Sequence, residues 1–370
     1  MKIGILTYCN AYNYGAYLQA YNLCTKLKTY DGIEAELIDL RMPQEEENYA
    51  VKIHKNLFVT YDKWAKDVSF KRAAKDLPLS PYSIRTADIG EFKRQVEGKY
   101  DLLIAGSDQI WQVKGFRGSY NAYFLPGDYG CPKVAYAASG RQPFDSVDEA
   151  TKKKICEAIN DFSYVGVRDI ATYNNVKSVL EDKEKLAYNL DPSFLLQYVG
   201  DAERGREILK RHRVPLDKPV IGIMTENTET GKKLKSRLGS RYTYIGLFHR
   251  QKGCSNLLKI TPFEWADVIA CCCFMISSYF HGTCYSLINH IPFHTVEMRY
   301  SKEESKLYGL LSDFKITERF SGSLDEAMSS QDFWNQIETR DMDYTGISKI
   351  IEEYNEQFDS FVSMIKGLQK

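Results

Sequence analysis

His281 lies where a proton-transferring side chain is useful. It follows the apolar run 273–277, which predicts a buried strand, and precedes a helix predicted over 283–289. Free N–H groups and the positive end of the helix dipole attract anions at such a junction, and an imidazole there can deliver or accept a proton near neutral pH. The alternative is a histidine that merely satisfies the backbone. Because Gly282 and Thr283 follow directly, we favour a functional role.

Arg168 occupies a similar position in the first half of the chain. It follows the apolar residues 164–167, so its guanidinium is expected to project from a sheet end as a bidentate fork for carboxylate or phosphate. A surface ion pair between Arg168 and Asp169 is the competing interpretation. The position favours a role in anion binding.

Two polar segments could contact a sugar. Residues 106–111 combine a permissive glycine, small polar groups and an aromatic platform, which suits a sugar or an anion but equally a satisfied turn. Residues 10–15 precede a helix and could present N–H groups to an acceptor. They lack the glycine patterns of dinucleotide and P-loop sites, so the sequence does not favour a nucleotide-binding site here.

Strands and helices alternate in both halves of the sequence. Strands are expected at 2–8, 33–40, 101–105, 133–137 and 164–167, and again at 219–224, 242–248, 273–277 and 293–297. The fold class is therefore α/β, with two doubly wound Rossmann-like domains facing a cleft. Because ligands of such sheets gather beyond the carboxyl ends of the strands, residues 138–140 and 166–169 join the segments above as candidate sites.

The expected domains are an N-terminal α/β domain over 1–198 and a C-terminal α/β domain over 199–343. A charged, mainly helical insertion at about 42–99 covers the first sheet, and an amphipathic helix over 344–370 packs back across. Thr261 and Glu264 have the spacing of a capping box, with Pro262 at the first helical position.

Composition excludes several classes of protein. Lysine plus arginine equals aspartate plus glutamate at 49 each, which argues against a nucleic-acid partner. No apolar run reaches the roughly 20 residues needed to cross a bilayer, and the start is too brief for a signal peptide, so we expect a cytoplasmic protein with at most peripheral membrane contact. The nine cysteines include 271–273 without metal-ligand spacing, so reduced thiols are favoured over a metal site.

Six motifs in order resemble the polysaccharide pyruvyltransferase family. They are Asn13-Tyr14-Gly15, residues 106–111, residues 135–140, Val167-Arg168-Asp169, residues 191–196 and residues 278–283. The resemblance runs from about residue 3 to about residue 320. It implies a fold similar to the GT-B glycosyltransferases, phosphoenolpyruvate as donor, a sugar hydroxyl as acceptor and a cyclic pyruvate ketal as product. No metal or cofactor is implied.

The resemblance also assigns roles to residues. Arg168 would bind the carboxylate or phosphate of the donor, and His281 would hold the phosphate or give a proton as C2 becomes cationic. The other donor-binding residues would be Ser139, Gly140, Ser278, Tyr279, Gly282, Thr283 and Arg299. The acceptor-binding residues would be Asn10, Asn13, Tyr14, Gly15, Ser107, Asp108, Gln109 and Trp111.

The sequence departs from the family at Tyr279, where an arginine is expected two residues before the histidine. A trianionic donor needs more than one cation, so Arg141, Arg250, Arg299 or Lys302 would compensate, or the donor differs. The leading hypothesis is pyruvyl transfer in the synthesis of a capsule or other surface polysaccharide, with a sugar or lipid-linked oligosaccharide acceptor at the inner membrane face. The alternatives are a nucleotide-sugar glycosyltransferase of GT-B type and a catalytically silent carbohydrate- or anion-binding homologue.

Overall fold

The structure is a computed structural model that describes residues 1–368; residues 369–370 of the predicted terminal helix lie outside the described residues. The chain forms two compact units. Unit 1 comprises Met1–Ala50, Ala74–Gln197 and the chain from Glu353 on, and unit 2 comprises Val51–Ala73 and Tyr198–Glu352. Residues 51–73, predicted as part of an insertion in the first domain, therefore belong to unit 2.

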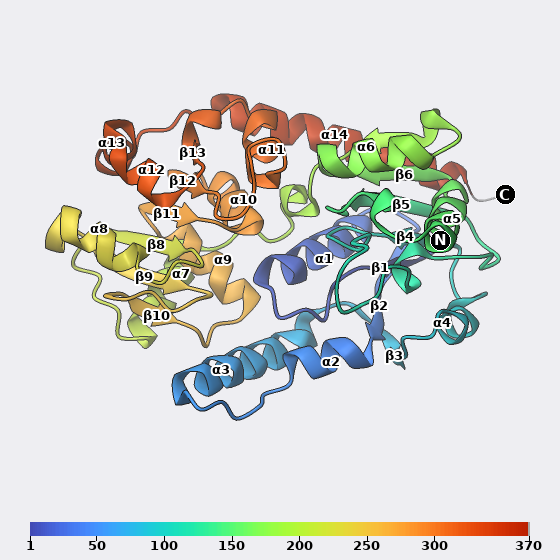
Figure 1. Ribbon diagram of the computed structural model, residues 1–370, viewed down its shortest axis with the longest axis horizontal. Coiled ribbons are helices and arrows are strands. Elements are labelled where there is room, and N and C mark those ends of the chain that lie inside the picture. Colours follow the sequence, from blue (N-terminus) through green and yellow to red (C-terminus); the bar gives the residue numbers. More distant parts are fainter. Residues whose placement is uncertain (369–370) are drawn as a thin grey trace. The chain divides into compact units, whose positions relative to one another are not determined.

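Unit 1 is built on a seven-stranded parallel sheet with the order β3-β2-β1-β4-β5-β6-β7 (Figure 1). Its central strands are buried along their whole length, as expected for a sheet covered on both faces. The strands are β1 (Lys2–Leu6), β2 (Glu34–Arg41), β3 (Leu79–Arg85), β4 (Leu102–Ala105), β5 (Lys133–Ala138), β6 (Tyr164–Val167) and β7 (Leu186–Tyr188).

Most helices of unit 1 begin at short polar side chains that accept hydrogen bonds from the first turn, whereas α2 begins after Met42 without such a cap. Asn13, Asp88, Asp148 and Asp169 cap four of them in this way. The helices are α1 (Tyr14–Leu27), α2 (Pro43–Tyr49), α4 (Ile89–Val96), α5 (Glu149–Asn160) and α6 (Ile170–Val179), with short 3₁₀ turns η1 (Ala74–Asp76), η2 (Ala122–Phe124), η3 (Phe144–Ser146), η4 (Lys183–Lys185) and η5 (Pro192–Leu195).

Unit 2 contains a six-stranded parallel sheet with the order β10-β9-β8-β11-β12-β13. Its strands are β8 (Val220–Met224), β9 (Thr243–Leu247), β10 (Ser255–Leu257), β11 (Phe274–Ser277), β12 (Phe293–Val296) and β13 (Phe320–Ser321). Its helices are α3 (Leu57–Ala73), α7 (Ala202–Arg211), α8 (Thr230–Leu238), α9 (Pro262–Ala270), α10 (Phe280–Ile288), α11 (Lys306–Asp313), α12 (Leu324–Ser329) and α13 (Gln331–Thr339), with 3₁₀ turns η6 (Gly239–Arg241) and η7 (Thr317–Arg319).

The predicted capping box is confirmed at the start of α9. Thr261 Oγ1 accepts from the Glu264 amide at 3.1 Å, and Glu264 Oε2 accepts from the Thr261 amide at 2.8 Å. Pro262 takes the first helical position, where no amide donor is required.

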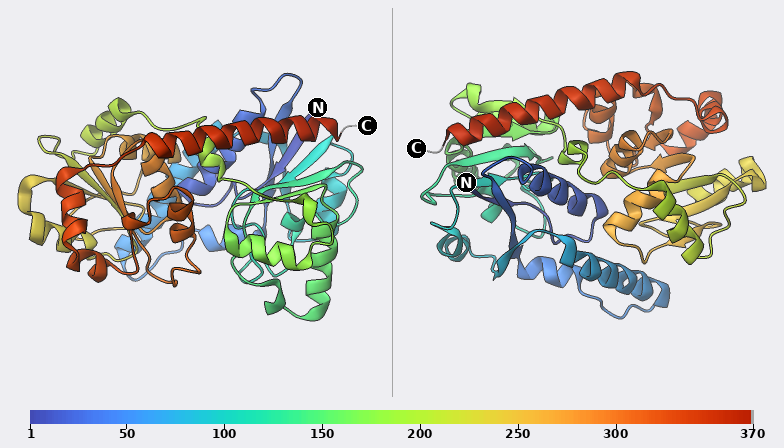
Figure 2. Two further views of the ribbon diagram at one scale, coloured as in Figure 1. Left: turned by 90° about the horizontal axis from the view of Figure 1, so that it is seen from above. Right: turned by 180° about the vertical axis from the view of Figure 1, so that it is seen from behind.

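The predicted terminal helix is also present, as the continuous helix α14 (Thr345–Gly367; Figure 2). Within unit 1, Phe358 and Phe361 pack on Tyr136 with ring centroids 5.2 and 4.8 Å apart. The C-terminal part of α14 thus packs back on the sheet of unit 1. At its start, Ser348 lies 3.4 Å from His290 within unit 2.

The four strands that the sequence analysis missed are the edge strands: β3 and β7 in unit 1, β10 and β13 in unit 2. An edge strand is covered less than a central one and lacks a continuous apolar run, so its pattern is weak. The strand β3 even contains Pro81, which an edge strand tolerates. The mainly helical character predicted for residues 42–99 is confirmed by α2, α3 and α4, but the stretch Leu79–Arg85 is a strand of the sheet and not part of a helical insertion.

Candidate active site

Each sheet has a switch point at which the strand order reverses. In unit 1 it lies between β1 and β4, and in unit 2 between β8 and β11. Crossovers that leave in opposite directions open a crevice at the carboxyl ends of these strands, which is where α/β sheets bind ligands. The candidate residues lie at these two places and are described unit by unit.

In unit 2, α10 begins at Phe280, earlier than predicted, so His281 lies in its first turn. The histidine is 8% exposed. Ser277 Oγ accepts from the Tyr279 amide at 3.0 Å, and a Cβ on Gly282 would lie only 2.4 Å from the same oxygen. The turn between β11 and α10 is therefore closely packed, and it fixes the position of the imidazole at the strand end.

Tyr279 joins three strand ends through a chain of polar contacts. Its hydroxyl lies 2.6 Å from His249 Nε2, beyond β9, and 3.4 Å from Glu226 Oε1, beyond β8. Arg299, beyond β12, donates to both oxygens of Glu226 at 2.7 Å. Since a carboxylate only accepts, Tyr279 donates to Glu226 and the Nε2–H of His249 donates to Tyr279.

Burial sets the charge states of Tyr279 and His249. It raises the pKa of Tyr279, and the charge of Glu226 adds to the effect. Burial also lowers the pKa of His249 to about 4, with a further contribution from the charge of Lys66. At neutral pH both His249 and Tyr279 are therefore uncharged.

Lys66 reaches this region from α3. Its Nζ lies 3.6 Å from the ring centroid of Phe248, and that ring lies 5.3 Å from the ring of Tyr279. Burial lowers the pKa of Lys66 to about 8, although the charge of Asp62 opposes the shift. Within residues 1–368 no carboxylate oxygen lies within 4.0 Å of this ammonium group.

Ion pairs hold α3 against the rest of unit 2. Arg250 donates to both oxygens of Asp62 at 2.7–2.9 Å, and Arg72 pairs with Glu264. Two of the cations predicted to compensate for Tyr279 are thus engaged by carboxylates: Arg250 with Asp62 and Arg299 with Glu226.

The remaining two predicted cations are Lys302 and Arg141. Lys302 Nζ lies 5.7 Å from the ring centroid of Tyr308. Arg141 belongs to unit 1. Lys66, which the sequence did not indicate, lies over the ring of Phe248, and that ring packs against Tyr279.

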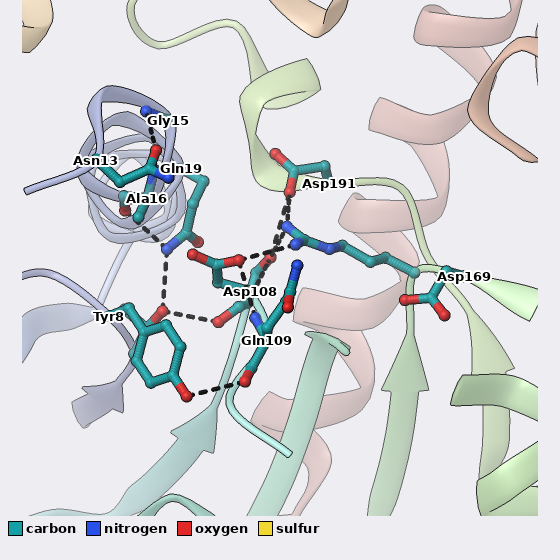
Figure 3. A network of polar contacts seen from close by, with 12 residues as sticks. Tyr8, Asn13, Gly15, Ala16, Gln19, Asp108, Gln109, Asp169 and Asp191 are labelled. Atoms are coloured by element: carbon teal, nitrogen blue, oxygen red, sulfur yellow. Dashed lines mark hydrogen bonds and ion pairs between the residues drawn. The ribbon is translucent and has the colours of Figure 1, made fainter. Parts of the chain in front are cut away.

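In unit 1, Arg168 is buried and forms ion pairs with Asp108 and Asp191, two carboxylates that Figure 3 labels. Its Nη2 donates to Asp108 at 2.9 Å, its Nη1 pairs with Asp191, and Ser107 Oγ lies 3.3 Å from Nη1. Burial opposes the guanidinium charge, but Asp191 and Asp108 outweigh it and raise the pKa of Arg168. Because Asp169 is also close, carboxylates outnumber the single cation, and these surroundings disfavour an anionic ligand.

The predicted acceptor residues of unit 1 divide by exposure. Asn10, Asn13 and Gln109 are partly exposed. Asn10 Nδ2 donates to Asp39 at 2.8 Å, and Asn13 caps α1 by accepting from the amides of Gly15 and Ala16. Figure 3 shows that Asn13 and Gln109 come from different segments of this unit: Asn13 follows β1, and Gln109 follows β4.

The others are buried: Tyr14, Gly15, Ser107, Asp108 and Trp111. Trp111 is a core residue at 0% exposure, stacked on Phe124 at 6.1 Å with its Nε1 donating to the Tyr123 carbonyl. The prediction that Trp111 forms an aromatic platform for a sugar is therefore wrong, because the indole is fully buried.

Ser139 and Gly140, predicted to bind the donor, lie in unit 1 beside Trp111. A Cβ on Gly140 would lie 2.4 Å from the Trp111 carbonyl, and the Gly140 amide donates to Thr172 Oγ1 at 2.8 Å. The other predicted donor residues are gathered at the strand ends of unit 2: Ser278, Tyr279, Gly282, Thr283 and Arg299.

The sequence analysis missed Glu226, His249 and Lys66. Glu226 and His249 follow β8 and β9, so the strand-end rule that selected His281 could have found them. No sequence signal pointed to Lys66, because its helix is far from the second domain in the chain.

Comparison with known proteins decides the family. The family model described as "Polysaccharide pyruvyl transferase" matches residues 13–298, most of the chain. The chain belongs to this family. It is therefore a transferase, and the predicted family and enzyme class are confirmed. None of the curated proteins matches it.

Solved structures similar to this transferase share its fold. HepE from Anabaena in complex with UDP-glucose has a TM-score of 0.55 at 10% identity, covering 98% of this chain and 100% of that one. A UDP-N-acetylglucosamine 2-epimerase has a TM-score of 0.53 at 10% identity, covering 96% and 94%. MnaA of S. aureus with UDP has a TM-score of 0.50 at 10% identity, covering 97% and 96%. The likeness confirms the predicted GT-B-like fold.

Two further features of the transferase bear on its class. Among residues 1–368, none of the helices is both long and apolar enough to span a bilayer. The same residues contain no group of three or more histidine, cysteine, aspartate or glutamate side chains placed to hold a metal ion.

Proposed function

We propose that this transferase moves the pyruvyl group of phosphoenolpyruvate onto two hydroxyls of a sugar and so forms a pyruvate ketal in a surface polysaccharide. The observation that carries the proposal is the place of His281. It lies in the first turn of α10, at the switch point of the second sheet, in a chain that belongs to the pyruvyl transferase family. The reaction takes place in the cytoplasm without a metal or cofactor.

The chemistry needs one proton donor and one anion site. Protonation of C3 makes C2 of the donor cationic, and a sugar hydroxyl attacks C2. The C2–O bond to phosphate then breaks, and a second hydroxyl closes the ketal. Of the two hydroxyl protons, one balances the proton given to C3 and the other leaves with phosphate. In this proposal the imidazole of His281 supplies the proton or holds the phosphate.

Lys66 provides the cation that the family places at position 279. As a compact point charge, its ammonium suits a phosphate or carboxylate oxygen. Its ammonium lies over the ring of Phe248, which packs against Tyr279, and it has no carboxylate within 4.0 Å among the described residues. Ser278 adds a hydroxyl whose oxygen is buried without a hydrogen-bond partner in the part of the chain that the structure describes. These groups support a donor site at the strand ends of unit 2.

For unit 1 we propose two different roles. Arg168 is a structural residue that joins the ends of β4 and β6 to the turn after β7, because Asp108 and Asp191 engage its guanidinium. The partly exposed Asn10, Asn13 and Gln109 are the acceptor-binding residues. A sugar or lipid-linked oligosaccharide is the acceptor.

The first test is donor binding by the full chain. Phosphoenolpyruvate should raise the melting temperature by several degrees, since a ligand at 100 times its dissociation constant adds about 2.7 kcal/mol. UDP-glucose should leave it unchanged. The reverse result would assign the protein to the nucleotide-sugar glycosyltransferases.

The second test uses matched variants in a phosphate-release assay with sugar diols. His281→Gln should abolish turnover, and His212→Gln, at the end of α7, should not. Lys66→Met should weaken donor binding, and Lys63→Met, an exposed residue of the same helix, should not. If the parent protein binds phosphoenolpyruvate but releases no phosphate with any acceptor, it is a silent homologue.

A further inference from the structure

The helix α3 exposes large apolar side chains to solvent. Leu57, Phe58, Tyr61 and Trp64 are 74, 66, 48 and 42% exposed, and Ile53, just before the helix, is 90% exposed. The spacing of Leu57, Tyr61 and Trp64 places them on one side of the helix. Ala65, Ser69, Phe70 and Ala73 of the same helix are buried, and α3 contacts α9 of unit 2.

The same segment is strongly basic. Residues 51–73 contain six lysine or arginine and two aspartate side chains, whereas the chain as a whole has no net charge. Both aspartates are paired, Asp62 with Arg250 and Asp67 with Lys71. The exposed surface of α3 therefore combines apolar side chains with a local excess of positive charge.

Cations from the two loops that flank β10 lie over the aromatic rings of α3. Arg250 lies 5.1 Å from the ring centroid of Phe58 and 5.9 Å from that of Tyr61. Lys259 Nζ lies 4.7 Å from the ring of Trp64. Tryptophan and tyrosine beside lysine and arginine are the residues that lie at the headgroup level of a bilayer. Because Asp62 engages Arg250, Lys259 is the cation of this pair that can reach a lipid phosphate.

We propose that the α3 face, formed by Ile53, Leu57, Phe58, Tyr61 and Trp64, docks on the surface of an anionic lipid bilayer. An amphipathic helix of this kind lies in the plane of the interface, held by its apolar face and by attraction to acidic headgroups. A second copy of the chain is the less suitable occupant, because two such basic faces repel each other. The proposal is independent of the donor, and it brings unit 2 to a surface where a lipid-linked acceptor is available.

Tryptophan fluorescence gives a direct test. Of the four tryptophans, Trp111 and Trp265 are fully buried and Trp334 is 8% exposed, so Trp64 is the one whose emission depends on solvent. Vesicles containing phosphatidylglycerol should shift the emission of the full chain to the blue, and vesicles of phosphatidylcholine alone should not. The shift should be absent in Trp64→Phe, which keeps an apolar ring.

Vesicle co-sedimentation then measures affinity. Leu57→Ser combined with Phe58→Ser should weaken binding by about tenfold or more, since both side chains are more than half exposed in solution and buried on docking. Ile170→Ser is the matched control, an isoleucine 56% exposed on α6 of unit 1, and should bind like the parent. High salt should weaken the parent as well.

Two outcomes overturn the proposal. One is equal sedimentation of the parent and the Leu57/Phe58 variant with anionic vesicles. The other is absence of binding together with a concentration-dependent dimer, detected by analytical ultracentrifugation, that the same variant dissociates. An unchanged circular dichroism spectrum shows that the variant is folded, whether or not the protein binds phosphoenolpyruvate.

Discussion

Replacing Arg168 by methionine tests the buried network of unit 1. The substitution keeps an apolar side chain of similar length but removes the guanidinium. Asp191, whose side chain is 0% exposed, and Asp108, at 11%, then lose their cation. Removing one partner of a buried ion pair costs about 3–5 kcal/mol, because the other charge remains buried. In a unit of this size each kcal/mol lowers the melting temperature by about 2–4 °C, so we expect a fall of about 6–20 °C.

Differential scanning calorimetry of the ligand-free protein measures this fall. Lys233→Met is the matched control, because it breaks a pair with Asp325 in which the side chains are 41 and 83% exposed. Exposed pairs contribute about 0–1 kcal/mol, so the control should melt close to the parent. The double variant Arg168→Met with Asp191→Leu should lose less stability than the sum of the losses of the two single variants. The reason is that it removes both partners of one ion pair and leaves neither charge of that pair buried alone.

The reasoning is refuted if Arg168→Met melts within the range of the control. Donor binding gives a second readout. If the structural role is correct, folded Arg168→Met keeps its melting shift with phosphoenolpyruvate, because the proposed donor site lies in unit 2. Loss of that shift in a stable variant would restore the role in donor binding that the sequence indicated.

Three other predictions concern protonation and packing. Burial lowers the pKa of His294 to about 4, so unfolded but not folded protein takes up a proton as pH falls from about 6.5 toward 4; stability should fall by about 3 kcal/mol over that window in urea titrations, and less in His294→Gln. Gly282→Ala should destabilise by about 1–3 kcal/mol in the same titrations because its Cβ would lie 2.4 Å from Ser277 Oγ, whereas Gly309→Ala, with open space around it, should stabilise slightly. The affinity for phosphoenolpyruvate should fall as pH rises through about 8, where Lys66 loses its charge, and calorimetric titration of Lys66→Arg should show no such fall.

The sequence contained enough information for the central elements of both sheets. Buried parallel strands such as β4 and β11 are continuous apolar runs, and the residues after them are polar, so local patterns locate both the strand and the candidate site beyond it. The capping box at Thr261 was equally local. His281 was found in this way, since its position depends only on the strand before it and the helix that contains it.

What depends on contacts between distant residues could not be predicted from local patterns. The ion pairs of Arg168 with Asp108 and Asp191 join residues 60 and 23 positions apart in the chain. The core position of Trp111 depends on Phe124 and Phe162, and the edge strands show no pattern until a neighbour pairs with them.

Lys66 shows most clearly which features the sequence predicts and which only the tertiary structure decides. The sequence alone indicated that residues 42–99 are charged and mainly helical and that Tyr279 stands where the family has a cation. Only the tertiary structure decided that α3 belongs to unit 2 and that its Lys66 lies over Phe248, the aromatic neighbour of Tyr279. The physical reason is that local propensity sets the helix, whereas the ion pairs and apolar contacts that dock it come from residues almost 200 positions away.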